Sequence, residues 1–390
     1  ARELGIGTFP TYDTGDDVYI AGSTVLRYSD TGPTGTAPLD PEILVPLATI
    51  VPALDQMAGM VPINAPWQAS NAAAWDGQTL ETFLRSQLTF NERFFEVASA
   101  ATRPIFGAEP RELSLLFTLF YIAASGDETH PGTFERNFNT RGGAQQSRFY
   151  GGSQKVPLTV ASQLGRKRVV MDSPVRRIMQ GSSGATVVSD RLTVKCKLVI
   201  VAVPPALAGR IEYEPLLPFE RDQLTQRYGQ GTLTKVAAVY PRPFWRDAGL
   251  TGTAVATGGP VSATFDDSPP DGSIGVVFGF VGGDNARAYN AASPAQRRQQ
   301  VLNQYASFFG KQALDPSGFF ETVWSAEQWS RGCPVGIPAT GALLAYGSRL
   351  REPVGRIHWA GTETSTYWNG YMDGAVRSGE RAAAEALAVL

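Results

Sequence analysis

The chain has 390 residues, with 34 lysines and arginines against 36 aspartates and glutamates, and a formal net charge of −2. This balance excludes the strongly basic surface that nucleic acids or acidic lipid headgroups attract. Two cysteines, Cys196 and Cys333, are too few for a disulfide framework and suit a reducing compartment. Since there is also no apolar run of about 18 residues, we expect a cytoplasmic protein without a membrane span.

The first five residues, Ala1 to Gly5, resemble the last turn of a helix closed by a glycine cap. The start of that helix would precede Ala1, so we expect the chain to be a piece of a longer one. Helical periodicity follows over residues 40–60 and 77–127, with a proline-containing loop at 62–66 between them.

After Gly142 the pattern changes to short apolar runs separated by turn residues. A helix is predicted at 156–164 and a helix at 294–309. Between them we expect strands, because alternating or continuous apolar runs of this length are typical of sheets. The predicted strands are 168–171, 175–179, 185–188, 192–194, 198–203, 235–240, 254–257, 262–265 and 275–280.

The C-terminal stretch 356–383 combines a buried strand (357–360), a Gly/Thr/Ser turn and a helix that begins after Gly370. The backbone N–H groups at that helix start suit an anion, either a phosphate or the electron-rich edge of a reduced cofactor. We predict that one face of the helix packs closely on a sheet, formed by Ala375, Val376, Gly379, Ala382, Ala383 and Leu387.

The order of elements predicts a fold of the α+β / α/β class with two interleaved domains. One is a nucleotide-type, Rossmann-like sheet and the other is a mixed α+β domain.

Few side chains are suited to acid–base or nucleophilic catalysis. His130 and His358 are the only histidines and lie far from the cysteines in sequence, so we expect no metal site. His358 alternates within a strand and is expected to be a packed imidazole. The sequence has no Gly-x-Ser-x-Gly elbow and no P-loop. A chain rich in aromatic residues with so few titratable candidates favours a cofactor that carries out the difficult step.

Residues 356–383 closely resemble the FAD-binding C-terminal signature of the flavin-containing amine oxidases, the monoamine oxidase family. Further segments match in the same order over nearly the whole chain: Ala65-Pro66-Trp67, Trp75-Asp76, 141–145, 151–153, 199–205, 233–235, Pro243-Phe244-Trp245, Trp324 and Gly332-Cys333. The resemblance implies a substrate-binding domain made of residues 18–149 and 225–327. It implies an FAD-binding domain made of residues 1–17, 150–224 and 328–390.

The resemblance also implies roles for single residues. Lys235 matches the family lysine that holds a water beside the flavin N(5) atom, and Trp324 matches a tryptophan packed near the isoalloxazine ring. Tyr371 matches one wall of the aromatic cage that guides the amine nitrogen. The remaining matches predict a substrate cavity lined by Gln145, Phe280, Phe138 and Pro334, and FAD contacts from Val175, Gly361, Thr362, Glu363, Tyr371 and Met372. For Gln145, Phe280 and Val175, ordinary packing explains the residue equally well.

One departure from the family pattern is at the second wall of the cage. The family usually has an aromatic residue after the cysteine, whereas Pro334 follows Cys333 here. A tyrosine facing a proline makes a wider cage that suits a bulky saturated ring, and in this the chain resembles the bacterial alicyclic amine oxidases, the cyclohexylamine oxidases. Those enzymes hold FAD without a covalent bond, so we predict non-covalent FAD with Cys333 as a neighbour.

A second departure concerns the dinucleotide fingerprint. The family opens with a strand, a Gly-x-Gly-x-x-Gly turn and a helix. Gly5-Ile-Gly7 here runs into Pro10, and Gly229-Gln-Gly231 lacks the third glycine. We therefore expect the chain to bind FAD poorly by itself, with an N-terminal chain completing the FAD site. The alternative assembly is a homodimer.

The function that the resemblance implies is oxidative deamination of a primary alicyclic or aryl/alkyl amine by FAD and dioxygen, giving a ketone or aldehyde, ammonia and hydrogen peroxide. An L-amino acid oxidase is an alternative that needs a cationic clamp, for which Arg141, Arg148 and Arg331 are available. A polyamine oxidase would need acidic residues along its channel. A non-catalytic fragment without flavin is the alternative that the absent glycine turn favours.

Overall fold

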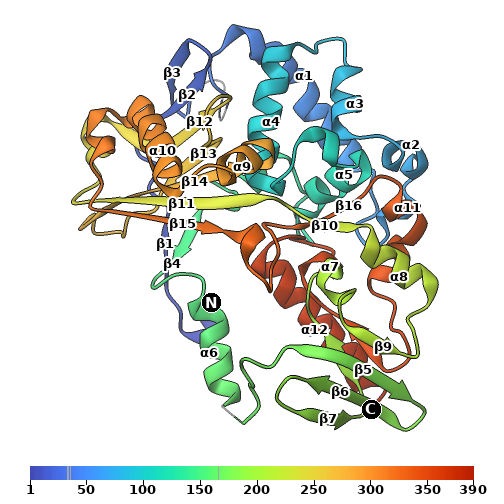
Figure 1. Cartoon of the computed structure of the whole chain (residues 1–390). Coiled ribbons are helices and arrows are strands. Elements are labelled where there is room, and N and C mark those ends of the chain that lie inside the picture. The colour runs from blue at the N-terminus through green and yellow to red at the C-terminus, as the bar shows by residue number, and fades with distance from the viewer. Residues whose placement is uncertain (33–34, 36, 166) are drawn as a thin grey trace.

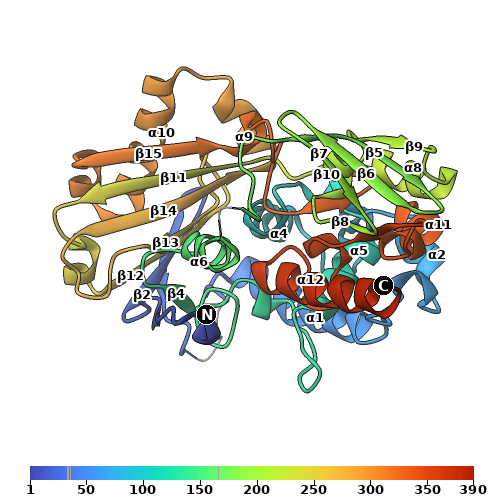
Figure 2. The ribbon, with the colours of Figure 1, turned by 90° about the horizontal axis from the view of Figure 1, so that it is seen from below.

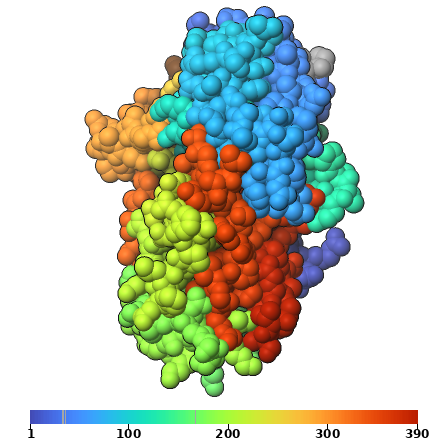
Figure 3. Space-filling view, turned by 90° about the vertical axis from the view of Figure 1, so that its right-hand side faces the viewer, coloured from blue at the N-terminus to red at the C-terminus, as the bar shows by residue number. Residues whose placement is uncertain are grey.

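The computed structural model describes residues 1–32, 35, 37–165 and 167–390. A block of helices occupies one end of the molecule, a seven-stranded sheet lies beside it, and smaller sheets lie at the opposite end (Figure 1). The C-terminal segment, orange to red in Figure 3, lies between the helical block and the small sheets. Segments from the whole chain therefore meet near the middle of the molecule.

The large sheet has the strand order β15-β11-β14-β13-β12-β2-β3. Its neighbours are antiparallel except for β12 and β2, which are parallel. The strands are β2 (Asp16–Ala21), β3 (Thr24–Tyr28), β11 (Leu233–Tyr240), β12 (Leu250–Ala256), β13 (Ala263–Asp266), β14 (Gly275–Gly282) and β15 (Gly318–Val323).

Alternation along the strands gives this sheet two different faces. One face packs under α10 (Pro294–Phe309) and is fully buried; we call it the sealed face, made of Val236, Ala238, Tyr240 and Val277. The opposite side chains are only partly buried. We call this side the open face, and it carries Lys235, Ala237, Phe265, Phe278 and Phe280.

The helical block consists of short helices around one apolar core. Except for Ala123, every residue of α5 is buried, because its sequence is apolar on all sides. The long helical region predicted for 77–127 is interrupted at Asn91, which caps α4, and at Gly107, which takes a left-handed conformation (φ 67°). The helices are α1 (Pro41–Ala58), α2 (Ala72–Asp76), α3 (Leu80–Arg85), α4 (Glu92–Phe106) and α5 (Leu115–Ala124).

At the opposite end, α12 (Met372–Ala388) packs against β17 (Ile357–Trp359), which pairs in parallel with β8 (Val199–Val201). A four-stranded sheet has the order β7-β6-β5-β9. Figure 2 shows α12 and the separate helix α6 (Lys155–Leu164) on this side. The sheet strands are β5 (Val175–Gly181), β6 (Gly184–Ser189), β7 (Thr193–Cys196) and β9 (Glu212–Glu214).

The remaining elements labelled in Figure 1 are two small antiparallel ribbons and four short helices. The ribbons pair β1 (Thr8–Pro10) with β4 (Ser147–Phe149) and β10 (Tyr228–Gln230) with β16 (Gly336–Pro338). The helices are α7 (Pro205–Ala208), α8 (Phe219–Gln226), α9 (Gly283–Asn290) and α11 (Ala342–Tyr346).

Several predicted elements are confirmed, including the helix at 294–309 and the left-handed cap at Gly5 (φ 66°). His358 is packed as expected, 4% exposed with Nδ1 3.4 Å from Glu385. The strand predicted at 168–171 is wrong. No strand forms there, and the following Asp172 is left-handed (φ 53°) before Pro174, so the segment turns instead of pairing.

The predicted packing face of the C-terminal helix is also wrong in part. Of the six predicted residues only Ala382 is buried, Gly379 is partly buried, and Ala375, Val376, Ala383 and Leu387 are exposed. The buried stripe is Gly374, Ser378, Ala382 and Ala386. These four residues recur every fourth position, so they share one face. Ser378 belongs to it because its hydroxyl accepts the backbone N–H of Gly361 (3.0 Å).

None of the described helices is long and apolar enough to cross a membrane. The described residues also contain no group of three or more His, Cys, Asp or Glu side chains arranged to hold a metal ion. The division into two domains by residue range stays a prediction.

Candidate active site

Lys235 lies on the open face, where β11 pairs with β14. Its register partner is Phe280, and its Nζ atom is 5.9 Å from the ring centres of both Phe278 and Phe280. On its other side Lys235 pairs with Thr322 of β15. The alternation of β11 thus places one cation beside an aromatic surface that is not sealed by a helix.

Cys333 joins this region through backbone contacts among three distant segments. Its N–H donates to the carbonyl of Gly231 (2.9 Å), and the N–H of Thr232 donates to Gly107 (2.8 Å). A Cβ at Gly107 would lie 2.6 Å from the Cys333 carbonyl oxygen, so a side chain there would force the segments apart. Close backbone approach therefore brings the segment of Cys333 and Pro334 next to β11.

The Cys333 thiol is held as a neutral group. Burial raises its pKa to about 11, although the nearby Lys235 ammonium lowers it. Its Sγ atom lies 3.8 Å from the carbonyl of Leu233 as a weak donor. Because the thiolate is the nucleophile, this thiol has little reactivity near neutral pH.

Trp324 begins a short 3₁₀ helix directly after β15, whose last residue, Val323, pairs with Thr234. Trp324 is thus adjacent to the strand that carries Lys235. Its indole Nε1 is buried and has no hydrogen-bond partner among the described residues. A buried N–H without a partner is unusual and is a candidate donor to a ligand.

The C-terminal stretch folds back on itself between β17 and α12. The Thr362 hydroxyl donates to the carbonyl of Tyr371 (2.9 Å), which ties the turn after β17 to the start of α12. Glu363 is buried, and burial raises the pKa of its carboxyl. Its neighbour Gly361 takes φ 103° and closes the strand.

The start of α12 offers backbone donors to a partner. Tyr371 is its N-cap residue and, within the described part of the chain, makes no side-chain capping hydrogen bond. Met372, the first helical residue, is 44% exposed. These N–H groups with the positive end of the helix dipole, and the unpartnered indole of Trp324, fit the electron-rich edge and plane of the expected flavin.

The Tyr371 ring lies at the edge of the helical core. It packs against the Tyr121 ring (centroids 6.0 Å apart) and edge-on against Trp368 (5.2 Å), and its hydroxyl donates to the carbonyl of Asn137 (3.0 Å). Tyr121, Asn137 and Trp368 were not predicted as site residues from the sequence. The available signal was a lone tyrosine in the run 115–124, which is apolar apart from this residue and Thr118.

The other predicted substrate residues divide between this core and a separate loop. Phe138 packs on the same core as Tyr371 and meets Phe134 edge-on (5.4 Å). Gln145 has its backbone anchored, since its carbonyl accepts the Thr11 hydroxyl (2.6 Å). Val175 lies on β5 among the small sheets, at the opposite end from β11, and is 37% exposed (Figure 1).

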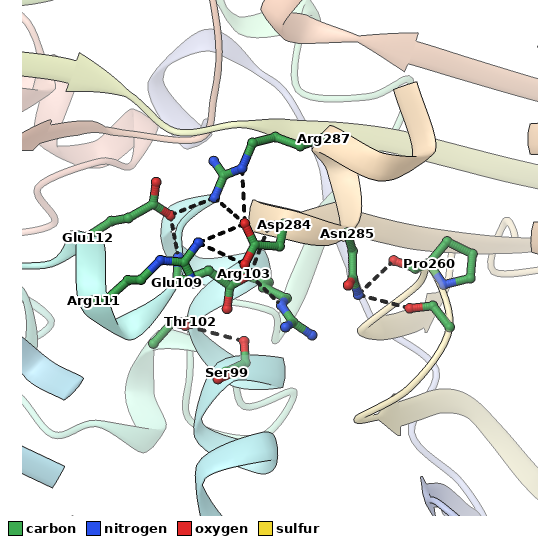
Figure 4. A network of polar contacts seen from close by, with 11 residues as sticks. Ser99, Thr102, Arg103, Glu109, Arg111, Glu112, Pro260, Asp284, Asn285 and Arg287 are labelled. Atoms are coloured by element: carbon green, nitrogen blue, oxygen red, sulfur yellow. Dashed lines mark hydrogen bonds and ion pairs between the residues drawn. The ribbon is translucent and has the colours of Figure 1, made fainter. Parts of the chain in front are cut away.

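An ionic network fixes the end of the strand that carries Phe280. Figure 4 shows the buried Glu109 carboxylate accepting from Arg103 (2.8 Å) and from the backbone N–H of Asp284 (2.8 Å). Arg111 pairs with the Asp284 carboxylate (2.8 Å). Since Asp284 follows β14 at the start of α9, the network ties the open face to the helical block.

The three arginines considered as a carboxylate clamp all have other partners. Arg141 pairs with Asp13 (3.1 Å) and Asp30 (3.0 Å), and Arg148 is ion-paired with Asp267. Arg331 donates to the backbone carbonyl of Gln328 (3.0 Å).

Comparison with known proteins gives one consistent result. The family described as flavin containing amine oxidoreductase matches residues 2–387. AofH of Mycobacterium tuberculosis, named as a flavin-containing monoamine oxidase, is 39% identical over 100% of this chain and 83% of its own length. The flavin-containing amine oxidase B of Sus scrofa is 35% identical over 99% of this chain and 73% of its length.

Two solved structures extend the likeness to the fold. Cyclohexylamine oxidase from Brevibacterium oxydans IH-35A superposes with a TM-score of 0.91 at 35% identity, covering 99% of this chain and 83% of that one. Putrescine oxidase bound to putrescine gives a TM-score of 0.92 at 30% identity, covering 99% and 84%. The predicted mixed helix-and-sheet fold is confirmed.

Proposed function

The chain belongs to the flavin-containing amine oxidoreductases, and from that premise we propose that it oxidises a primary alicyclic or aryl/alkyl amine. The products are a ketone or aldehyde, ammonia and hydrogen peroxide. Members of the family are oxidoreductases, so this chain is an enzyme, and its cofactor is FAD.

The observation that carries the proposed substrate class is the apolar character of the open face. Where β15, β11, β14 and β13 pair, its positions include Ala237, Ala263, Phe265, Phe278, Phe280, Phe320 and Thr322, and Lys235 is the single charge among these described residues. None of these positions holds a carboxylate. An aromatic and aliphatic wall favours a hydrocarbon ring or chain over a second ammonium group.

The residue types of the proposed amine cage support a bulky ring. A Cβ at Gly370 would lie 3.0 Å from Val335 Cγ2, so the segments of Tyr371 and Pro334 run side by side. We assign the cage to these two residues, Tyr371 contributing a π face and Pro334 a compact aliphatic ring. Phe138 and Gln145 complete the proposed cavity wall.

FAD, when bound, would supply the hydride acceptor and the chemistry with dioxygen. The chain's own task is to present the substrate as a neutral amine, because an alkylammonium has no free electron pair to expel hydride. A free alkylamine has a pKa near that of lysine, about 10. Desolvation in the proposed cavity, to which Phe280 and Tyr371 are assigned, would disfavour the ammonium, so no side-chain base is needed.

We assign Lys235 to the oxygen half of the reaction. Its ammonium, beside Phe280 and near Cys333, provides positive charge and donors where negative charge develops on oxygen. Trp324 would hold the cofactor ring. The further FAD contacts proposed are Val175 at the adenine end, Gly361, Thr362 and Glu363 near the phosphate or ribitol, and the Met372 amide at the ring.

We further propose that FAD is held without a covalent bond. The Cys333 thiol, with its pKa raised to about 11 by burial, contains little thiolate at neutral pH. Acid precipitation of the purified protein should release the yellow flavin into the supernatant. Flavin that stays in the pellet would contradict this assignment.

A diamine is the second candidate, because putrescine oxidase is among the similar structures. An amino acid is less well supported, since the Arg141 and Arg148 side chains already pair with carboxylates. The cytoplasmic location, the homodimer and the completion of the FAD site by a further segment stay predictions from the sequence.

A peroxide-coupled assay of the FAD-loaded protein with cyclohexylamine, benzylamine, putrescine and phenylalanine tests the proposal. We expect cyclohexylamine or benzylamine to have the highest kcat/KM and phenylalanine to give no turnover. If putrescine had the highest kcat/KM, the preferred substrate would be a diamine. A protein whose absorption spectrum has no flavin bands after loading with FAD would refute the proposed catalysis.

A further inference from the structure

The hydroxyl of Tyr371 is held from the side of the helical block. It donates to the carbonyl of Asn137 at 3.0 Å, and the side-chain oxygen of Asn137 is 3.5 Å away. Asn137 is 3% exposed, and its amide donates to the carbonyls of Thr133 and Phe134 (3.3 and 3.2 Å). The acceptor carbonyl is thus part of a short turn whose conformation the Asn137 side chain fixes.

That turn is itself attached to two helices. The Ser125 hydroxyl at the end of α5 donates to the carbonyl of Thr133 (2.9 Å) and accepts its N–H (3.1 Å). The N–H of Phe134 donates to Asp55 of α1 (2.7 Å). The Asn137 carbonyl therefore has a defined position relative to the helical core.

Tyr121 supports the same ring from α5, with the two ring centroids 6.0 Å apart. Burial and the nearby Tyr371 side chain raise the pKa of Tyr121 well above its usual value, and burial also raises the pKa of Tyr371. A Cβ at Gly370 (φ 85°) would lie 2.6 Å from the Tyr121 hydroxyl, so glycine makes the approach possible.

Trp368 supports the ring from a third direction in a strained conformation. Its φ of 51° is in the left-handed region, which is unfavourable for a bulky residue. Its N–H donates to the carbonyl of Ala124 (2.6 Å) and its carbonyl accepts the N–H of Tyr371 (3.0 Å). Strain that the surrounding bonds maintain is typical of functional sites.

We propose that Tyr121, Asn137 and Trp368 are positioning residues that fix the orientation of the Tyr371 ring. The inference rests on the proposed function, in which Tyr371 is one wall of the amine cage. The Tyr371 hydroxyl has a single O–H, and this donates to the carbonyl of Asn137. It is therefore not free to act as an acid or base, and Tyr371 contributes the placement of its π face.

Double-mutant kinetics test this assignment in the FAD-loaded full chain. We expect Tyr121→Phe and Tyr371→Phe each to lower kcat/KM for the best amine about 3- to 10-fold. The double variant should be no worse than the poorer single one, because both substitutions act on the position of the same ring. The pH dependence of kcat/KM should keep its wild-type shape, since no titrating group is lost.

A matched control is Tyr240→Phe. Tyr240 is also buried and its hydroxyl also donates to a backbone carbonyl, that of Ala313 (2.9 Å), but it lies on the sealed face. In urea unfolding without substrate or flavin, Tyr240→Phe and Tyr121→Phe should lower the midpoint by similar amounts. Only Tyr121→Phe should lower kcat/KM. Asn137→Asp, which loses the amide donors of the turn, should behave like Tyr121→Phe.

The alternatives give distinct outcomes. Wild-type kcat/KM in Tyr121→Phe, or effects that multiply in the double variant, would overturn the positioning role while leaving Tyr371 in the cage. Loss of a pH-profile limb in Tyr371→Phe would make the phenol an acid–base group and overturn it as well. If Tyr371→Ala leaves amine turnover unchanged, the cage assignment itself fails, whatever the unfolding midpoints show.

Discussion

The two faces of the seven-stranded sheet come from the same strands but differ in what covers them. Side chains of the sealed face, such as Val236 and Tyr240, lie under α10 with no more than 1% exposure. On the open face, one residue away along each strand, Lys235 and Phe280 remain partly exposed, and Phe320 is 65% exposed. The comparison indicates that one face stabilises the sheet and the other is available to ligands.

Trp245→Ala should produce the largest effect, on stability alone. Trp245 is fully buried among the Tyr240, Phe244 and Phe309 rings, and its indole N–H donates to Asp266 (2.9 Å). We expect a loss of about 3–5 kcal/mol in the free energy of unfolding, measured with urea. Trp245→Phe keeps most of the packing and should cost clearly less. If the variant folded normally but lost turnover, the sealed face would take part in activity, and the assignment of stability to one face and ligand binding to the other would be wrong.

Asp17 gives a pH-dependent test at the far end of the open side. It is largely buried, and burial raises its pKa to about 7 although the Thr251 hydroxyl lowers it. The unfolded carboxyl titrates near 3.9, so the folded state binds the extra proton between about pH 4 and 7. Stability from this group is therefore present below about pH 4 and is lost as pH rises through 7.

Asp17→Asn should remove that dependence. Above pH 7 the variant should be more stable than the wild type, by at most about 4 kcal/mol from the size of the shift. At pH 4 the two should differ little, because the wild-type carboxyl is then protonated in the folded state and about half protonated in the unfolded state, so little of the penalty has developed. Thermal unfolding at pH 4, 6 and 8 measures this. A constant difference between variant and wild type across that range would contradict the assignment.

Lys235→Met tests the open face as a chemical surface. We expect flavin reoxidation by dioxygen to slow about 10- to 100-fold, or about 1.4–2.7 kcal/mol in the barrier, because the variant lacks positive charge at that position. Anaerobic flavin reduction by the amine should change much less. Stopped-flow absorbance separates the two half-reactions, and equal slowing of both would remove Lys235 from the oxygen step.

Phe280→Ala and Phe309→Ala form a matched pair across the sheet and should give the smallest effects on activity. Phe280 is on the open face, and Phe309 is buried under the sealed face. We expect Phe280→Ala to raise KM for a cyclic amine several-fold with a modest loss of stability. Phe309→Ala should destabilise by about 3–5 kcal/mol with KM unchanged. Steady-state kinetics and urea unfolding on both variants provide the comparison.

Local pattern was sufficient for much of the fold and for part of the site. The helix 294–309 was predictable from periodicity and Pro294 at its first turn, and β11 and β14 from their apolar runs. The hairpin of β2 and β3 and the edge strand β15 were overlooked, although the run Asp17 to Tyr28 alternates around a glycine turn. The false strand at 168–171 had apolar residues but no partner to pair with.

The site residues found by resemblance are those with strong local motifs, such as Lys235 and Tyr371. Tyr121 and Asn137 were not predicted as site residues, because their role depends on contacts with residue 371 that no local sequence pattern contains. The face of α12 was misjudged for the same reason. Ser378 is buried because Gly361 requires its hydroxyl, and hydrophobicity alone would place Ser378 in solvent.

The backbone contacts among Gly107, Gly231 and Cys333 have a consequence for how the chain folds. Each of the three is more than a hundred residues from the next along the chain, yet their backbones are in direct contact. Closing such large loops costs conformational entropy before the contacts can compensate for it. We therefore expect contacts of this kind to form late in folding. A partly folded chain accordingly lacks the contacts that bring Cys333 next to β11, so this part of the proposed site is complete only in the finished structure.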